Sequence, residues 1–178
     1  MPSLVDRMIR AAKLDANLDE EVEADTGATK QAMLVVVLSS LAAGIGSVSA
    51  AGLMGLLFGA LSALVGWYIW AFLTYFIGTR FLPEPQTEAD VGQLLRTIGF
   101  SSSPGLLRVA GVIPGLTGIV FLASGVLMLV AMVIAVRQAL DYHSTGRAIG
   151  VCLIGWVVQV VIILLVMTFL GIGAETKP

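Results

Sequence analysis

The chain has 178 residues, of which 57% are hydrophobic and only 12% are charged, and its formal net charge is −2. A soluble domain carries about twice that charged fraction, and a nucleic-acid-binding domain concentrates its basic residues in a patch. No Asp, Glu, Lys or Arg occurs from Gln31 to Thr79, which is longer than a soluble core helix requires. Composition therefore excludes a soluble domain and a nucleic-acid partner, and it predicts an all-α, polytopic bundle in contact with membrane lipids.

The first segment, MPSLVDRMIRAAKLD, has the periodicity of a short amphipathic helix. Ser3 followed by Asp6 resembles a capping box at its start. Its polar face carries Arg7, Arg10 and Lys13. This basic face suits either the anionic cytoplasmic surface of a bilayer or packing on the protein's own cytoplasmic loops. Residues 15–25 are acidic and are predicted to be a solvated linker, so residues 1–28 precede a membrane domain at 29–172, and 173–178 form a short tail.

The first two predicted spans, residues 33–51 and 53–78, are joined by an uncharged link and should form a tight hairpin. The second span ends in the aromatic cluster GWYIWAFLTYF, which is typical of the headgroup region. Gly55 and Gly59, with Ala63, form a stripe of small residues that lets two helices approach closely. The stripe predicts a contact with another helix of this chain or with a second subunit.

Residues 87–98 are predicted to form an amphipathic helix that is capped by Thr87 and Asp90 and lies along the membrane interface. It leads into GFSSSPGLLRVAGVIPG, which is apolar but interrupted by prolines and glycines. As an α-helix, residues 98–113 reach about 24 Å, which is less than the ~30 Å of a hydrocarbon core. Length alone therefore argues against a crossing at this stretch.

The distribution of basic residues argues for the crossing. Two more spans follow, residues 117–136 and 148–171, separated by the loop from Arg137 to Arg147. With a span at 98–113 this loop falls on the same side as the loop from Arg80 to Arg96, whereas without it the two loops lie on opposite sides. The positive-inside rule predicts five spans, with the N-terminus inside and the C-terminus outside.

The third predicted span should be short, kinked at Pro104, turned at Pro114 and enclosed by the other helices, because a proline leaves a backbone group unpaired. Arg108 is the one charge inside it, and no predicted span contains an acidic residue. An unsatisfied arginine there costs roughly 2.5–3.5 kcal/mol on insertion scales. Two alternatives stay open: a contact with Gln159, which lies at a similar depth, or snorkelling of the side chain to the outer surface.

Nothing in the sequence predicts catalysis or a cofactor. His143 is the only histidine and Cys152 the only cysteine, which excludes a multi-histidine metal or haem site and an internal disulfide. Asp141, His143 and Ser144 are the residue types of a hydrolytic triad, but neighbours in a turn rarely reach that geometry. Ser144 is better placed to cap the last helix. We therefore expect neither an enzyme nor a bound metal or cofactor.

The order of these features resembles a bacterial member of the Yip1 domain family over nearly the whole chain. The most telling elements are the aromatic end of span two, Gly99-Phe100 with Pro104, the Ile113-Pro114-Gly115 turn, and the STGRAIG entry to the last span with Arg147. The resemblance implies five membrane helices and a cytosolic N-terminus, in the cytoplasmic (inner) membrane. Trafficking members of the family act through Rab GTPases, but they have longer cytosolic N-terminal domains than this chain.

These features predict a non-enzymatic scaffold or interaction protein that packs against itself or other membrane proteins. The expected contacts are span two and the cytoplasmic loops. One alternative is an accessory subunit of a larger respiratory or photosynthetic membrane complex. A second alternative is a small transporter or channel, which would need a polar path through Arg108 and Gln159.

Overall fold

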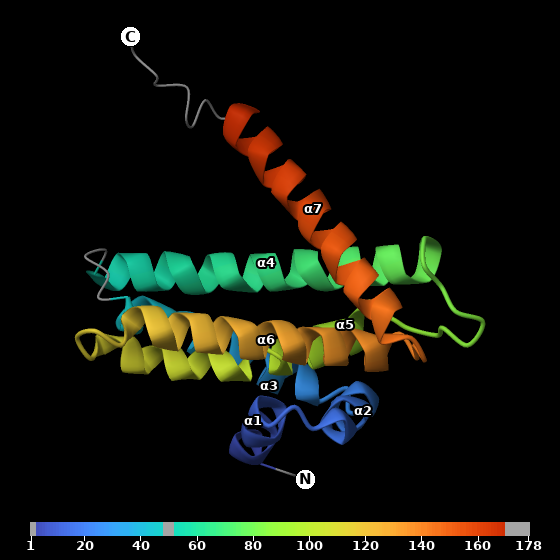
Figure 1. The fold of residues 1–178 in the computed structure, drawn as a ribbon, viewed down its shortest axis with the longest axis horizontal. Helices are drawn as coiled ribbons and strands as arrows, with labels where there is room; N and C mark the ends of the chain where they lie inside the picture. Colours follow the sequence, from blue (N-terminus) through green and yellow to red (C-terminus); the bar gives the residue numbers. More distant parts are fainter. Residues whose placement is uncertain (1–2, 48–51, 170–178) are drawn as a thin grey trace.

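The computed structural model describes residues 3–47 and 52–169, and within these ranges every regular element is a helix (Figure 1). The predicted span ends at 48–51 and 170–171 and the tail at 173–178 lie outside the described residues. The elements are α1 (Leu4–Ala12), α2 (Ala16–Ala24), α3 (Ala28–Gly46), α4 (Gly52–Arg80), α5 (Val91–Phe100), the 3-10 helix η1 (Ser103–Val112), α6 (Thr117–Ala139) and α7 (Thr145–Phe169).

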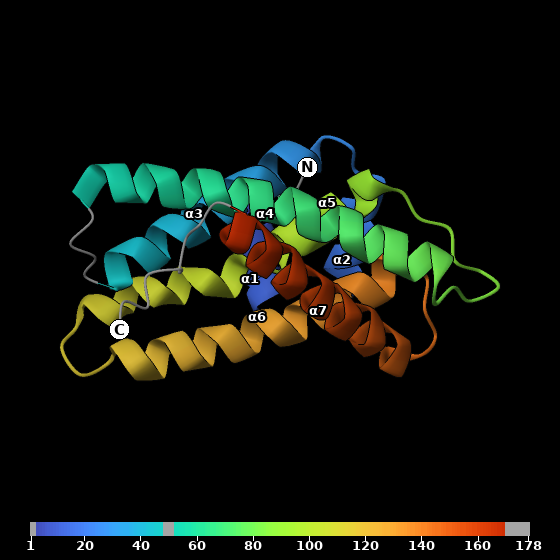
Figure 2. The same cartoon turned by 90° about the horizontal axis from the view of Figure 1, so that it is seen from above.

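Four of these helices, α3, α4, α6 and α7, are long and apolar enough to cross a membrane. Neighbouring elements pack in the order α4, α3, η1 and α6, and α7 contacts both α4 and α6 (Figure 2). In Figure 1, α7 crosses the long axis of α4 and α6 at a steep angle and leaves the bundle toward its C-terminal end. The prediction of an all-α membrane bundle is thus confirmed at the level of four apolar helices.

The third predicted span differs from the expected kinked α-helix. The α-helix α5 ends at Phe100, and residues 103–112 form η1 with Pro104 in its first turn. A 3-10 helix rises about 2.0 Å per residue, compared with about 1.5 Å for an α-helix, so the ten residues of η1 extend about 20 Å rather than about 15 Å. The stretch is therefore interrupted rather than kinked, and it reaches further than its length as an α-helix would allow.

Close packing on α3 explains the 3-10 conformation. Three pairs mark the contact: Gly99 with Ala32, Gly105 with Ser39, and Gly111 with Gly46. The partners on α3 recur every seven residues, which is two α-helical turns, whereas the glycines recur every six residues, which is two 3-10 turns. Within η1, three residues per turn keep Gly105 and Gly111 on one stripe, and the order of the three pairs shows that the α5–η1 segment runs in the same direction as α3.

The predicted turn at Ile113-Pro114-Gly115 is confirmed. Pro114 occupies the second position and Gly115 the third, where its φ of 85° is readily adopted only by glycine. The N–H of Leu116 donates to the carbonyl of Ile113 at 3.1 Å and closes the turn. The chain then reverses into α6.

The helix α5 is a core element rather than an interfacial one. Leu94 and Phe100 are fully buried, because α2, α3, α4 and α6 all pack around α5. Its N-cap is Asp90, which forms a capping box with Gln93, and the predicted cap Thr87 instead accepts a hydrogen bond from the N–H of Glu84. The amphipathic pattern was correctly assigned to a helix, but its apolar face packs against protein.

The N-terminal residues form a layer docked on the bundle. Ser3 caps α1 as predicted, but the acidic run is the helix α2 rather than a solvated linker, since Leu18 and Val22 are buried. Arg7 is only 2% exposed and forms ion pairs with Glu21 at 2.9 Å and Asp25 at 2.8 Å. Of the two alternatives for α1, the structure therefore shows packing on the protein itself.

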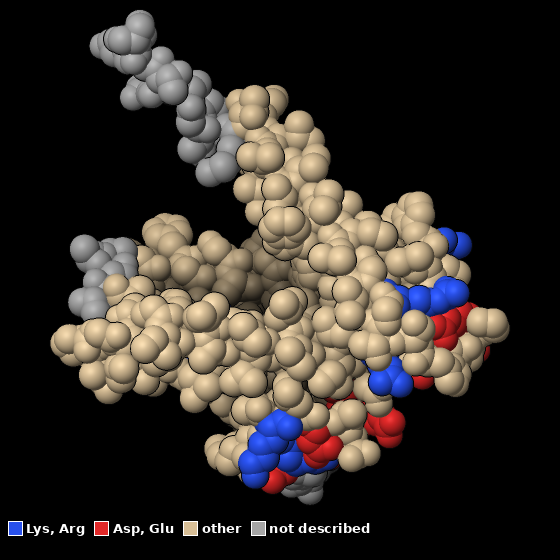
Figure 3. Space-filling model, viewed as in Figure 1, with Lys and Arg blue, Asp and Glu red and all other residues tan. Residues whose placement is uncertain are grey.

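Charged side chains gather on one side of the molecule. Figure 3 shows them along the lower and right-hand edges, over the N-terminal layer and the loops at the α4–α5 and α6–α7 connections. The outer parts of α4, α6 and α7 show only uncharged atoms in this view. This separation is expected for a membrane protein whose charged loops share one aqueous face.

Candidate functional site

A cavity of about 340 Å³ touches each of the four long helices. Helices α3, α4, α6 and α7, together with the α5–η1 segment, supply its walls. Its polar lining consists of Ser39, Ser40, Ser102, Arg108 and Gln159. Because the surrounding helices are apolar, we call this space the polar cavity.

Arg108 contacts α6, a partner that the sequence does not predict. Its Nε donates to Ser124 Oγ at 3.1 Å, and its guanidinium lies over the ring of Phe121, 5.4 Å from the centroid. The hydroxyl of Ser124 donates to the Phe121 carbonyl, so its oxygen is free to accept from Arg108. Gln159 lines the same cavity, but the acceptor of the Arg108 hydrogen bond is Ser124 on α6 and not Gln159 on α7.

A second cavity, of about 570 Å³, adjoins the first. Trp70, Met132 and Gln159 line both spaces, so the two meet at these side chains. The remaining lining is mainly apolar and comes from α6 and α7: Leu129, Cys152, Leu153 and Trp156. We call this second space the apolar cavity.

Trp70 stands at the junction of the two cavities with an unused polar atom. Its indole Nε1 is buried and has no hydrogen-bond partner among the described residues. Buried donors are normally paired, since an unpaired one loses its bond to water without replacement. In contrast, Nε1 of the neighbouring Trp67 donates to the Leu95 carbonyl at 3.0 Å.

The small-residue stripe of span two faces the same chain. A Cβ added at Gly59 would lie 3.8 Å from Ser40 Oγ of α3, and Gly55 and Gly59 line one groove with Ala43 and Gly44. The stripe therefore packs toward α3, which is one of the two contacts that its spacing predicts.

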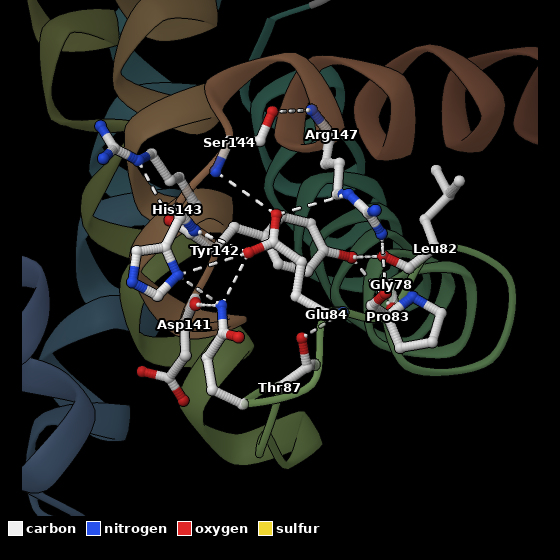
Figure 4. A network of polar contacts seen from close by, with 12 residues as sticks. Gly78, Leu82, Pro83, Glu84, Thr87, Asp141, Tyr142, His143, Ser144 and Arg147 are labelled. Carbon is white, nitrogen blue, oxygen red and sulfur yellow. Dashed lines mark hydrogen bonds and ion pairs between the residues drawn. The ribbon is translucent and has the colours of Figure 1, made fainter.

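Outside the apolar helices, Glu84 joins the α4–α5 connection to the start of α7 (Figure 4). Its carboxylate accepts hydrogen bonds from the backbone N–H groups of His143 at 3.0 Å and Ser144 at 3.3 Å. The His143 N–H and the other donors hold the pKa of Glu84 below its usual range. Arg147 adds an ion pair at 3.4 Å and donates to the Pro83 carbonyl at 2.7 Å. We call this network the Glu84 clasp.

The residue types of a triad at Asp141, His143 and Ser144 are used in other ways. The Nδ1 of His143 lies 2.7 Å from Nε2 of Gln86, and Ser144 Oγ accepts from the N–H of Arg147 at 3.4 Å, in line with its predicted capping role. The hydroxyl of the buried Tyr142 lies within 2.9 Å of the Gly78 and Leu82 carbonyls, which ties the α6–α7 loop to the end of α4.

Replacing Glu84 with Ala is expected to release the start of α7. The N–H groups of the loop and Arg147 would lose their shared acceptor, so α7 should separate more often from α4 and α6. Cys152 reports this directly, because it is the only cysteine and is buried on α7. We expect its labelling by a maleimide to become several-fold faster in Glu84→Ala than in the wild-type chain.

Glu88→Ala is the matched control, since Glu88 is an exposed carboxylate of the same connection. Equal labelling rates in the two variants would show that the Glu84 clasp does not hold α7 in place.

No family model, no curated protein and no solved structure matches this chain.

Proposed function

We propose that the chain is a non-enzymatic integral membrane protein of five crossings that acts by packing against another membrane subunit. Its N-terminus is cytoplasmic and its C-terminus lies outside. The fifth crossing is the α5–η1 segment, whose combined length of about 35 Å is sufficient for a hydrocarbon core of about 30 Å. Its course parallel to α3 and the return through α6 support this topology.

The arrangement of charge supports the same orientation. The Glu84 clasp and the N-terminal layer both lie at the charged face, which the positive-inside rule assigns to the cytoplasm. The resemblance to the Yip1 domain family implies the same number of crossings and the same cytosolic N-terminus. We therefore place the protein in the cytoplasmic membrane of a bacterium.

The exposed second half of α7 is the observation that carries the interaction role. The first half of α7 contains three buried residues, Ala148, Val151 and Cys152. Four consecutive residues in its second half are exposed: Ile162 by 41%, Ile163 by 48%, Leu164 by 58% and Leu165 by 64%. Successive residues point about 100° apart around a helix, so these four cover its whole circumference. This half of α7 is therefore free to pack against a helix of another subunit.

Photo-crosslinking in the native membrane tests this role. A photoreactive residue at Leu164 should give one discrete protein adduct, and mass spectrometry then identifies the second component. A second copy of the chain or a single partner supports a scaffold, whereas a fixed set of redox subunits indicates the accessory-subunit alternative.

Leu57 is the matched control position, because it is a leucine of α4 with 55% exposure. It should yield adducts with lipid alone. Protein adducts of equal yield at both positions, or at neither, would contradict a contact made by α7.

A further inference from the structure

The two cavities are adjacent and differ in chemical character. The polar cavity contains a guanidinium and three serine side chains, while the apolar cavity is lined mainly by leucine, tryptophan and methionine. Trp70, Met132 and Gln159 belong to both linings and mark the junction. A pocket that is charged at one end and apolar at the other fits a molecule built in the same way.

The charge at the polar end has no counter-charge among the residues that the structure describes. Arg108 pairs with no carboxylate among the described residues, and the sequence has no Asp or Glu from 26 to 83 or from 91 to 140. Only Nε of its guanidinium has a hydrogen-bond acceptor in the described structure. An arginine has five N–H donors, and a bound anion would be attracted strongly here because the surroundings are poorly polarisable.

We propose that the two adjacent cavities together bind one anionic lipid, whose phosphate or carboxylate pairs with Arg108 and whose chain passes Trp70, Met132 and Gln159 into the apolar cavity. The chain leaves the protein between α6 and α7, past Leu129 and Trp156. Figure 1 shows that α7 diverges from the bundle toward its C-terminal end. A zwitterionic lipid fits less well, since its own cation would lie close to the guanidinium.

Lipid binding to the purified, delipidated full-length chain tests this proposal. The probes are palmitoyl-oleoyl phosphatidylglycerol, phosphatidylcholine with the same chains, oleate and inorganic phosphate. Native mass spectrometry should show one bound phosphatidylglycerol, with at least tenfold weaker retention of phosphatidylcholine. Binding of oleate would assign the site to carboxylates as well as phosphates. Equal retention of both phospholipids, or stabilisation by inorganic phosphate alone, would overturn the proposal.

Two variants test the two halves of the binding mode. Arg108→Gln should reduce phosphatidylglycerol retention to the level of phosphatidylcholine. Gly66→Leu should abolish retention by filling the polar cavity, and its Cβ has room, since no heavy atom of the described structure lies within 4 Å.

Gly118→Leu is the matched control for Gly66→Leu, because its Cβ is equally unobstructed and Gly118 lines neither cavity. It should bind lipid like the wild-type chain. Unchanged phosphatidylglycerol retention in both Arg108→Gln and Gly66→Leu would overturn the proposal. These measurements use the isolated chain, so they are independent of any partner that packs against α7.

Discussion

Replacing Gly46 with Ala is expected to lower the free energy of unfolding by about 3 kcal/mol, at the upper end of the usual cost of overpacking a core. The added Cβ would overlap the carbonyl oxygen of Arg108. A flexible side chain could rotate away, but this oxygen belongs to the backbone of η1. Relief therefore requires η1 to move away from α3 along its length.

The measurement is thermal or denaturant unfolding in detergent, with Gly118→Ala as the control. The Cβ at Gly118 meets no heavy atom of the described structure within 4 Å, so that variant should be as stable as the wild-type chain or slightly more so. Gly105→Ala distinguishes a clash with a side chain from a clash with the backbone, because its Cβ would overlap a side-chain atom, Ser39 Oγ. Adding Ser39→Gly should recover part of the loss. Equal stabilities for Gly46→Ala and Gly118→Ala would show that η1 adapts freely.

This packing also explains which parts of the fold are predictable. Hydropathy and length locate α3, α4, α6 and α7, because these helices satisfy their own backbone groups and face lipid. The conformation of η1 depends instead on contacts with α3, and a helix of ten residues gives no such signal by itself. One signal is present in the sequence: Gly105 and Gly111 recur at a spacing that fits three residues per turn.

The sequence does not predict the N-terminal layer, because this layer also depends on contacts between separate elements. Charge dominates residues 15–25 and favours a solvated linker, whereas the pair Leu18 and Val22 has the spacing of one helical face. The buried cation Arg7 then neutralises two of the carboxylates, which becomes visible only when α1 and α2 are brought together. Ion pairs between separate helices leave no periodic pattern in a sequence.

Some residues of the candidate site can be identified from the sequence, and others cannot. Arg108 and Gln159 are identifiable because polar side chains are rare within apolar spans, and both line the polar cavity. Ser124 cannot be singled out in this way, because serines are common in membrane helices. Its pairing with Arg108 also depends on the turn between η1 and α6. The Glu84 clasp joins residues 59 or more positions apart, which no local pattern reveals.

The pH dependence of stability provides the second prediction of large effect. Asp19 is 8% exposed, and burial raises the pKa of its carboxyl group to about 8, with further contributions from the nearby charges of Asp15 and Glu23. The unfolded chain loses this proton at about pH 4, whereas the folded chain keeps it up to about pH 8. In this window the folded state binds more protons, so stability is greatest at acidic pH and falls as the pH rises.

Asp19→Asn should therefore flatten the dependence of the melting temperature on pH between about 5 and 8, and it should make the chain more stable than the wild type at pH 8. The slope removed is at most about 1.4 kcal/mol per pH unit, which is the limit for one proton. Glu23 contributes in the same direction, because burial and the charge of Asp141 raise its pKa to about 7, so Glu23→Gln serves as the comparison. Parallel profiles for the wild-type chain and Asp19→Asn would mean that Asp19 is ionised in the folded protein, and hence that the N-terminal layer admits water at that position.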